Sequence, residues 1–85
     1  MRVDKFLRVS RLVKRRTWAQ EMCLAGRVSV NGKPARPATT VRPGDVIRLD
    51  TEWRALEVRV LELRERASAE EARRMYEVVS SQHRE

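Results

Sequence analysis

Residues 26–33 read Gly26-Arg27-Val28-Ser29-Val30-Asn31-Gly32-Lys33, and this stretch predicts the centre of the fold. Val28-Ser29-Val30 alternates apolar and polar side chains, as a half-buried strand does. Asn31-Gly32 is the dipeptide that most favours the tight turn of a β-hairpin. Gly26 is typical of the residue that ends a helix in the left-handed conformation. The stretch therefore predicts a helix that stops at Gly26 and leads into a hairpin.

Two helices are predicted before this hairpin. Over residues 3–13, apolar side chains recur at helical spacing and cations project from the opposite side. Thr17 and Gln20 have the spacing of a capping box, so a second helix is predicted to begin at Thr17. Its buried face consists of Ala19, Met22 and Cys23. Lys14-Arg15-Arg16 then join the two helices in a tight, basic elbow.

Strands are predicted after the hairpin. Pro34 and Pro37 remove backbone donors, so this segment is an edge strand or a loop. Pro43-Gly44 is typical of a type II turn and precedes the apolar run over residues 46–49. A turn is expected over residues 51–54. The next alternating positions are Leu56, Val58 and Val60, and the break at Leu61 indicates a bulge or a strand end.

A last helix is predicted near the C-terminus. Ser68 and Glu71 have the spacing of a second capping box. Ala72, Met75, Tyr76 and Val79 form an apolar stripe at helical spacing. Residues 80–85 are polar, and we expect them to fray.

Positive charge is concentrated in the N-terminal part of the chain. Residues 1–36 contain ten Lys and Arg against two acidic residues, whereas residues 37–85 contain nine basic and ten acidic residues. Proteins that bind a polyanion concentrate cations where it docks, because released counterions drive binding. The start of the second helix adds free N–H groups and a dipole that favour an anion. A solvated charged surface is the alternative, but this distribution favours nucleic acid.

The length and the cysteine content limit the remaining possibilities. With 85 residues, the chain has room for one domain and one modest core. Cys23 is the single cysteine, so neither an intrachain disulfide nor a zinc cluster is possible, which fits a reducing compartment. No apolar stretch has the length of a signal peptide or a membrane span. We therefore expect a soluble, cytoplasmic protein.

Residues that could carry catalysis are few and poorly placed. His83 is the single histidine and lies in the predicted frayed end. Cys23 lies on the buried face of the second helix, which favours a structural cysteine over a nucleophile. Asp4 and Asp45 are isolated in sequence, and no Gly-rich phosphate loop or metal-ligand spacing is present. We expect no enzymatic activity, no cofactor and no metal site.

The two tryptophans have different surroundings in the sequence. Trp18, just inside the second helix, could stack on a base or pack at the edge of the core, and packing is the default for a single tryptophan. Trp53 lies in a predicted turn without neighbouring cations, so we assign it no role.

Four segments together resemble the S4 RNA-binding domain. They are Arg2-Val3-Asp4-Lys5-Phe6-Leu7, Arg11-Leu12-Val13-Lys14-Arg15-Arg16-Thr17, Gly26-Arg27-Val28-Ser29-Val30-Asn31-Gly32-Lys33 and Val41-Arg42-Pro43-Gly44-Asp45. The resemblance covers residues 1 to 50. The chain length and the segment Glu70-Glu71-Ala72-Arg73-Arg74-Met75-Tyr76 further resemble the bacterial ribosome quality control factor P (RqcP) family. The related 15-kDa heat-shock protein has a longer, strongly basic C-terminal extension, unlike the short, nearly neutral tail here.

This resemblance implies a fold and a function. The fold is α+β of the S4 (αL-like) type, with two N-terminal helices packed on a small antiparallel β-sheet plus a C-terminal helix. Residues 1–66 would form the S4 domain, and residues 67–85 a helix packed on that same domain. RqcP-like proteins bind the obstructed large ribosomal subunit through its rRNA and the peptidyl-tRNA. They support alanine tailing of the stalled nascent chain by a partner of the RqcH/NEMF class.

The charge pattern and the resemblance together predict an RNA-binding surface. Arg2 and Arg16 are the positions that the resemblance implies first, and Arg27 and Lys33 beside the Asn31-Gly32 turn are secondary. The complete predicted set is Arg2, Lys5, Arg8, Arg11, Lys14, Arg15, Arg16, Thr17, Arg27 and Lys33. Arginine suits such contacts because its planar fork binds phosphate in a bidentate manner.

Two other functions remain open at this stage. One is RNA binding with a different target, as in ribosome assembly or the rescue role of the related heat-shock protein. The other is a protein-docking module that uses the acidic and apolar last helix. We expect a monomer that does not contact a membrane.

Overall fold

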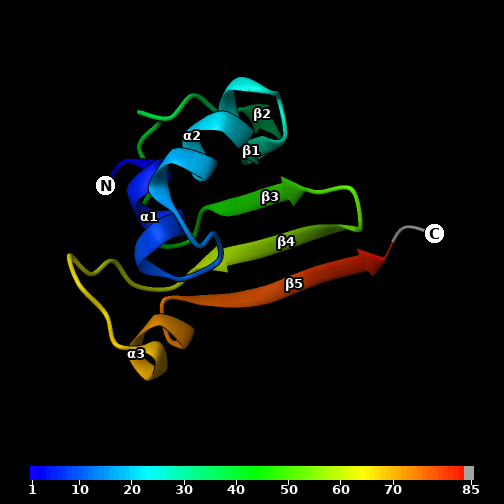
Figure 1. Cartoon of the computed structure of the whole chain (residues 1–85). Helices are drawn as coiled ribbons and strands as arrows, with labels where there is room; N and C mark the ends of the chain where they lie inside the picture. The colour runs from blue at the N-terminus through cyan, green and yellow to red at the C-terminus, as the bar shows by residue number, and fades with distance from the viewer. Residues whose placement is uncertain (84–85) are drawn as a thin grey trace.

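The computed structural model describes residues 1–83, which form three helices and five strands around one core (Figure 1). The helices are α1 (Val3–Val9), α2 (Arg16–Leu24) and α3 (Ala69–Arg73). The strands are β1 (Val28–Val30), β2 (Lys33–Pro34), β3 (Val46–Asp50), β4 (Arg54–Val60) and β5 (Tyr76–His83). No helix within residues 1–83 is both long enough and apolar enough to cross a membrane.

All five strands belong to one antiparallel sheet with the order β2-β1-β3-β4-β5. The register places Ile47 of β3 between Val30 of β1 and Val58 of β4, so apolar residues line one face. Helices α1 and α2 cover this face, and α3 lies at the start of β5 (Figure 1). The architecture is therefore the α+β arrangement that the sequence predicts.

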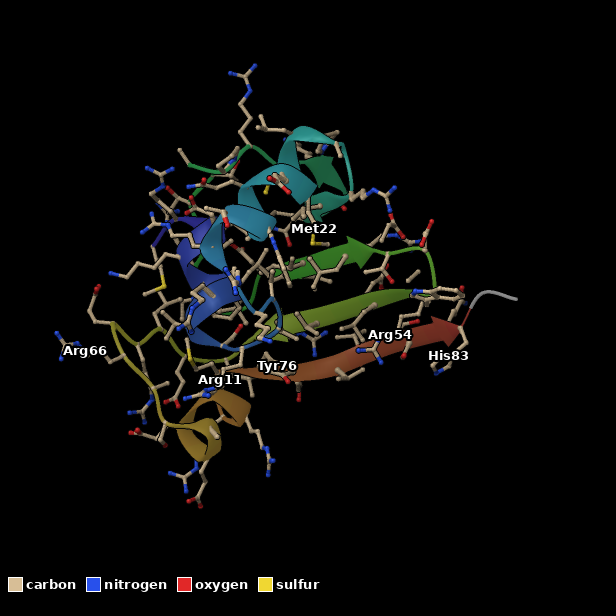
Figure 2. All side chains as sticks on the ribbon, viewed as in Figure 1. Arg11, Met22, Arg54, Arg66, Tyr76 and His83 are labelled. Atoms are coloured by element: carbon tan, nitrogen blue, oxygen red, sulfur yellow. The ribbon has the colours of Figure 1, made fainter. Side chains whose placement is uncertain are left out.

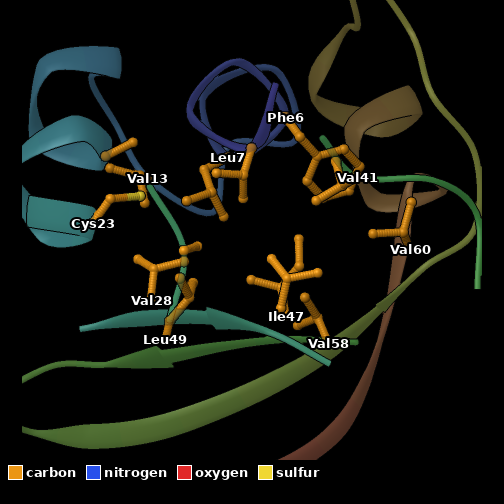
Figure 3. Close-up of a cluster of buried hydrophobic side chains, with 14 of the residues drawn as sticks. Phe6, Leu7, Val13, Cys23, Val28, Val41, Ile47, Leu49, Val58 and Val60 are labelled. Carbon is orange, nitrogen blue, oxygen red and sulfur yellow. The ribbon is translucent and has the colours of Figure 1, made fainter. Parts of the chain in front are cut away.

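The core lies between α1, α2 and the covered face of the sheet (Figure 3). Phe6 and Leu7 belong to α1, and Ile47 and Val58 belong to the sheet; all four side chains are fully buried. Burial of each such side chain stabilises the fold by about 1.5–3 kcal/mol. Because both helices depend on this core, it fixes where their cationic faces lie.

Glycine and asparagine shape the chain turns as predicted. Gly26 has φ +75° and ends α2, with the Gly26 N–H donating to Cys23 O at 3.0 Å and the Arg27 N–H to Met22 O at 2.9 Å. Asn31 (φ 51°) and Gly32 (φ 81°) both occupy the left-handed region, as the tight hairpin between β1 and β2 requires. At Pro43-Gly44 the Asp45 N–H donates to Arg42 O at 3.1 Å, which closes the expected turn.

The two N-terminal helices differ from their predicted bounds. Helix α1 ends at Val9 rather than reaching residue 13, because Arg11 adopts the left-handed conformation with φ 64°. Helix α2 begins at Arg16, with Arg15 at its N-cap position and no side-chain cap. The predicted capping box at Thr17 is wrong. Gln20 instead donates to a carboxylate in α1.

The C-terminal helix begins where predicted but is shorter. Ser68 and Glu71 form the expected capping box, with the Glu71 N–H donating to Ser68 Oγ at 3.1 Å. The helix then ends at Arg73, and the chain turns into β5. The expectation that Met75, Tyr76 and Val79 share a helical stripe is wrong, since Tyr76 and Val79 belong to the strand.

Pairing with β4 explains why these residues are not helical. Strand β5 satisfies its backbone groups along β4, with Tyr76 opposite Val60 and His83 opposite Arg54. Val and Tyr also suit a strand better than a helix. The predicted fraying is therefore wrong for residues 80–83, and residues 84–85 lie outside the described residues. Strand β4 ends at Val60, where the sequence indicates a break, and the ladder register shifts at Glu57/Val58.

Candidate nucleic-acid interface

A buried carboxylate organises the two helices that carry the predicted RNA-binding residues. Asp4 lies in the first turn of α1 and is fully buried. Its oxygens accept hydrogen bonds from Arg2 Nε at 3.2 Å, Arg16 Nη2 at 3.4 Å and Gln20 Nε2 at 3.0 Å. A further bond comes from the Lys5 backbone N–H at 2.7 Å. We call Asp4 with Arg2, Arg16 and Gln20 the Asp4 hub.

The hub keeps the Asp4 carboxylate charged. Burial by itself raises the pKa of Asp4, but the hydrogen bonds from Gln20, Arg16 and Arg2 outweigh it, so the pKa lies below its ordinary value. The charged carboxylate in turn fixes two arginines whose side chains remain 49% and 43% exposed. Arg2 and Arg16, the two positions implied first, are therefore held side by side and still reach solvent.

A basic cleft lies next to the hub. Its volume is about 350 Å³, and four of its cations come from α1, the turn after it and the start of α2: Lys5, Arg8, Arg11 and Arg16. The loop before α3 contributes Glu65, Arg66 and Ala67. Lys5 pairs with Glu65, and Arg11 Nη2 donates to Ala67 O at 3.4 Å. Figure 2 shows Arg66 projecting from this loop.

The basic elbow, residues 14–16, is exposed and stands where α2 begins. The first turn of α2 contains no acidic residue, and no side chain caps it. Uncapped N–H groups and the positive end of the helix dipole together favour an anion. Lys14 and Arg15 thus lie at a helix terminus suited to a phosphate, and Thr17 is exposed in the same turn.

Two predicted cations lie away from this surface. Arg27 follows the end of α2, and Lys33 begins β2 at the edge of the sheet opposite β5. Neither lines the basic cleft. The structure thus places the other predicted residues along α1, the turn after it, the elbow and the start of α2, and leaves Arg27 and Lys33 apart; these residues are Arg2, Lys5, Arg8, Arg11, Lys14, Arg15, Arg16 and Thr17.

The sheet face turned away from the helices has a different charge pattern. Arg48 pairs with Asp50 and Glu57 at 3.3 Å each, and Arg59 pairs with Glu77 at 2.6 Å. Hydrogen bonding to Asp50, with the charges of Asp50 and Glu57, raises the pKa of Arg48. In contrast, Arg8, Lys14 and Arg15 form no ion pair with any described carboxylate. Arg8, Lys14 and Arg15 on the helical side are therefore available to a polyanion, whereas Arg48 and Arg59 are already paired.

Cys23 is buried in α2, whereas His83 lies exposed on β5. Burial, and then the charge of Asp4, raise the pKa of the Cys23 thiol, which disfavours the thiolate. This confirms Cys23 as a buried cysteine. His83 is exposed at the end of β5, beside Arg54 (Figure 2). Within residues 1–83, no three His, Cys, Asp or Glu side chains are grouped as metal ligands would be.

Sequence reasoning missed three residues of the interface. Asp4 was expected to be isolated, but it is the centre of the hub. An available signal is its place in a helix turn with Val3 and Leu7, both buried, since an acid there must find cationic partners. Gln20 was assigned to a cap and instead reaches Asp4. No pattern in the sequence predicts that Arg66 lines the cleft, because only the path of residues 61–67 in the folded chain brings it there.

Comparison with known proteins identifies the family. Residues 1–47 match the S4 domain family. The chain is 43% identical over 82 residues to the RQC P-site tRNA stabilizing factor of Bacillus subtilis, covering 96% of this chain and 95% of that protein. It is 45% identical over 78 residues to the protein of that name from Halalkalibacterium halodurans, covering 92% and 89%.

A heat-shock protein family is also related. The chain is 37% identical over 78 residues to the Heat shock protein 15 homolog of Aeromonas salmonicida, covering 91% of this chain and 59% of that protein. The solved Heat Shock Protein 15 of Vibrio cholerae superposes with a TM-score of 0.85 at 28% identity, covering 94% of this chain and 82% of that chain. The solution structure of the hypothetical protein HP1423 gives a TM-score of 0.82 at 32% identity, covering 94% and 98%.

Helices α1 and α2, the basic elbow and strands β1 and β2 lie within the residues that match the S4 domain. Full-length similarity is found to the quality-control proteins, whereas the heat-shock homolog extends well beyond the matched region. This chain belongs to the S4-domain family and, within it, to the family of RQC P-site tRNA stabilizing factors.

Proposed function

We propose that this protein is an RNA-binding factor of ribosome-associated quality control. It binds the obstructed large ribosomal subunit through rRNA and the P-site peptidyl-tRNA and supports alanine tailing of the stalled nascent chain. The observation that carries the proposal is the set of cations along α1, the elbow and the start of α2, two of which, Arg2 and Arg16, are held by the buried Asp4 carboxylate, in a chain of this family. We infer the P-site tRNA as a ligand because its relatives are named RQC P-site tRNA stabilizing factors.

The mechanism is binding rather than catalysis. Arg2 and Arg16 contact phosphates beside the hub, while Lys5, Arg8 and Arg11 contact others along the basic cleft. Lys14, Arg15 and Thr17 provide a further contact at the start of α2. Contacts on two sides of the elbow let one small domain bridge rRNA and tRNA and slow the loss of the tRNA. Phosphate and shape dominate because the deep major groove of an RNA helix hides its base edges.

The partners and the location follow from this role. A tailing factor of the RqcH/NEMF class delivers alanyl-tRNA to the same particle. The protein works in the cytoplasm as a monomer, without a cofactor. Arg27 and Lys33, which lie apart from the cleft, make at most peripheral contacts with the RNA.

A rescue role of the heat-shock type is the second candidate, since the fold is shared with Heat Shock Protein 15. The higher identity to the quality-control factors, 43% and 45% against 37% for the heat-shock homolog, favours the quality-control role. Both candidate roles require RNA binding, and the tRNA content of the bound particle tests the quality-control role.

Gradient sedimentation of tagged protein from cell lysate, with sequencing of the bound RNA, tests the proposal. We expect wild-type protein to migrate with large subunits that carry tRNA. Arg16→Ala should move most of the protein to the top of the gradient, because the hub then lacks one of its two arginines. Arg8→Ala provides a second test, since Arg8 is exposed and has no part in the hub.

Arg59→Ala is the matched control, because Arg59 lies on the outer sheet face and pairs with Glu77. It removes one positive charge and should leave migration unchanged. Protein bound to subunits without tRNA would contradict the quality-control role and leave only an RNA-binding module. Protein that never enters the ribosomal fractions would contradict RNA binding and favour a protein-docking module.

A further inference from the structure

A partly apolar groove lies between α2 and the sheet, separate from the basic cleft. Its volume is about 250 Å³. Leu12, Trp18, Met22 and Leu56 contribute apolar surface, and Lys14 and Arg54 are the charged residues in its lining. Figure 2 shows Met22 between α2 and β3, and Arg54 on β4. No acidic side chain of residues 1–83 lines this groove.

Trp18 is not packed as a core residue. It is 48% exposed, whereas Ala19, the next residue of α2, is fully buried. The Arg15 guanidinium carbon lies 5.6 Å from the centroid of the Trp18 ring, within the range of a cation–π contact. The expectation that Trp18 packs at the edge of the core therefore describes only part of its surroundings. The rest of the ring borders the groove and solvent.

We propose that this groove binds one unpaired RNA nucleotide, with the base stacked on Trp18 and the adjoining phosphate held by Lys14, Arg15 or Arg54. The inference rests on the proposed RNA-binding function and adds a base-binding site to it. Aromatic side chains beside cations are the usual elements of single-stranded RNA sites, because every base offers a flat face. Leu12, Met22 and Leu56 supply the apolar surroundings for that base.

The charges of the lining favour a nucleotide over a peptide side chain. Two cations and no acid line the groove, so its occupant is anionic. A nucleotide has an aromatic base and a negatively charged phosphate. The base would stack on the Trp18 ring while the phosphate contacts the neighbouring Lys14. The groove also adjoins the basic elbow, since Lys14 belongs to both and Trp18 lies two residues after the elbow. RNA bound at the elbow therefore passes beside it.

The size of the effect follows from stacking. A base stacked on an aromatic side chain contributes about 1–3 kcal/mol, which corresponds to a roughly 5- to 150-fold change in affinity. Trp18→Leu keeps an apolar helix-forming residue and removes the ring. Trp18→Phe keeps a smaller ring. The two variants therefore separate apolar packing from stacking.

Quenching is measured on the full chain with Trp53→Phe, so that Trp18 is the single tryptophan; Trp53 is 74% exposed and lies outside the groove. Affinities of all variants, including those without Trp18, are measured from the fluorescence anisotropy of end-labelled oligomers. The two probes are a short oligoadenylate and the matching abasic oligomer, which has the same sugar-phosphate backbone without bases. We expect oligoadenylate to quench Trp18 fluorescence and to bind more tightly than the abasic oligomer. Trp18→Leu should weaken oligoadenylate binding at least fivefold and leave abasic binding unchanged, while Trp18→Phe keeps most of the difference.

Each other outcome has a distinct meaning. Equal binding of both oligomers to wild type and Trp18→Leu, with Arg16→Ala still weakening both, would overturn the base site and leave the proposed RNA-binding function intact. Failure of the wild type to bind either oligomer or purified large subunits at low salt would overturn the function and the site together. Quenching by an acidic, aromatic peptide but not by oligoadenylate would make the groove a protein site and overturn the proposal.

Discussion

At the scale of single residues, Asp4 has the largest influence on the interface. It accepts hydrogen bonds from Arg2, Arg16 and Gln20 while fully buried. Asp4→Asn keeps the shape and removes the charge that holds the two arginines. We expect the free energy of unfolding to fall by about 2 kcal/mol, a loss typical of hydrogen bonds to a charged group, as measured by urea denaturation.

RNA affinity should fall in the same variant even though its net charge rises by one. Added positive charge alone predicts tighter binding, whereas loss of the hub predicts weaker binding, so the sign of the change decides between them. Glu77→Gln is the control, because it adds the same charge on the outer sheet face. Tighter binding by both variants would show that Asp4 does not position the arginines.

The acid stability of the protein should also depend on Asp4. The pKa of Asp4 is lower in the folded protein than its ordinary value of 3.8, so as pH falls the unfolded chain takes up the proton first. The stabilisation is complete above the unfolded pKa and is lost as pH falls through the lower folded pKa. Urea midpoints measured between about pH 5 and pH 2 should therefore fall more steeply for wild type than for Asp4→Asn. Parallel curves would contradict this.

At the scale of elements, the C-terminal segment is part of the core. Met75 joins α3 to β5 and is fully buried, and its carbonyl oxygen accepts from the Leu61 N–H at 2.8 Å. We expect Met75→Ala to reduce the free energy of unfolding by about 2–4 kcal/mol through lost burial and the cavity left behind. Val79→Ala, at a position that is 45% exposed, should cost less than about 1 kcal/mol. Equal small losses would mean that the segment is only loosely attached.

At the scale of the whole molecule, charge is divided between two faces. Arg8, Lys14 and Arg15 on the helical side are exposed and form no ion pair with a described carboxylate, whereas Arg48 and Arg59 on the outer sheet face are paired with acids. RNA binding should therefore weaken steeply with salt, by about 0.7–0.9 in the log–log slope for each phosphate contacted. Arg8→Ala should reduce the slope by one such step, and Arg59→Ala should leave it unchanged. A complex insensitive to salt would contradict electrostatic docking.

Local features of the sequence predict most of the fold. The Asn31-Gly32 turn, the Gly26 helix end and the Ser68 cap each depend on one or two residues and their own backbone, and all three are present. Alternation in Leu56, Val58 and Val60 likewise indicates which face is buried. The failures are of another kind. Thr17 and Gln20 have a capping pattern, but Gln20 gains more from the buried Asp4 carboxylate than from its own helix end.

The sequence by itself determined the fold class, the hairpin and the half of the chain that carries the cations, because these depend on short-range geometry and on composition. Only the tertiary structure decided that Tyr76–His83 is a strand, since β4 offers the partner that completes its backbone hydrogen bonds. It also decided that Asp4 joins Arg2 and Arg16, and that Arg66 faces the basic cleft. Both depend on residues far apart in the chain, whose contacts exist only after α1 and α2 pack on the sheet.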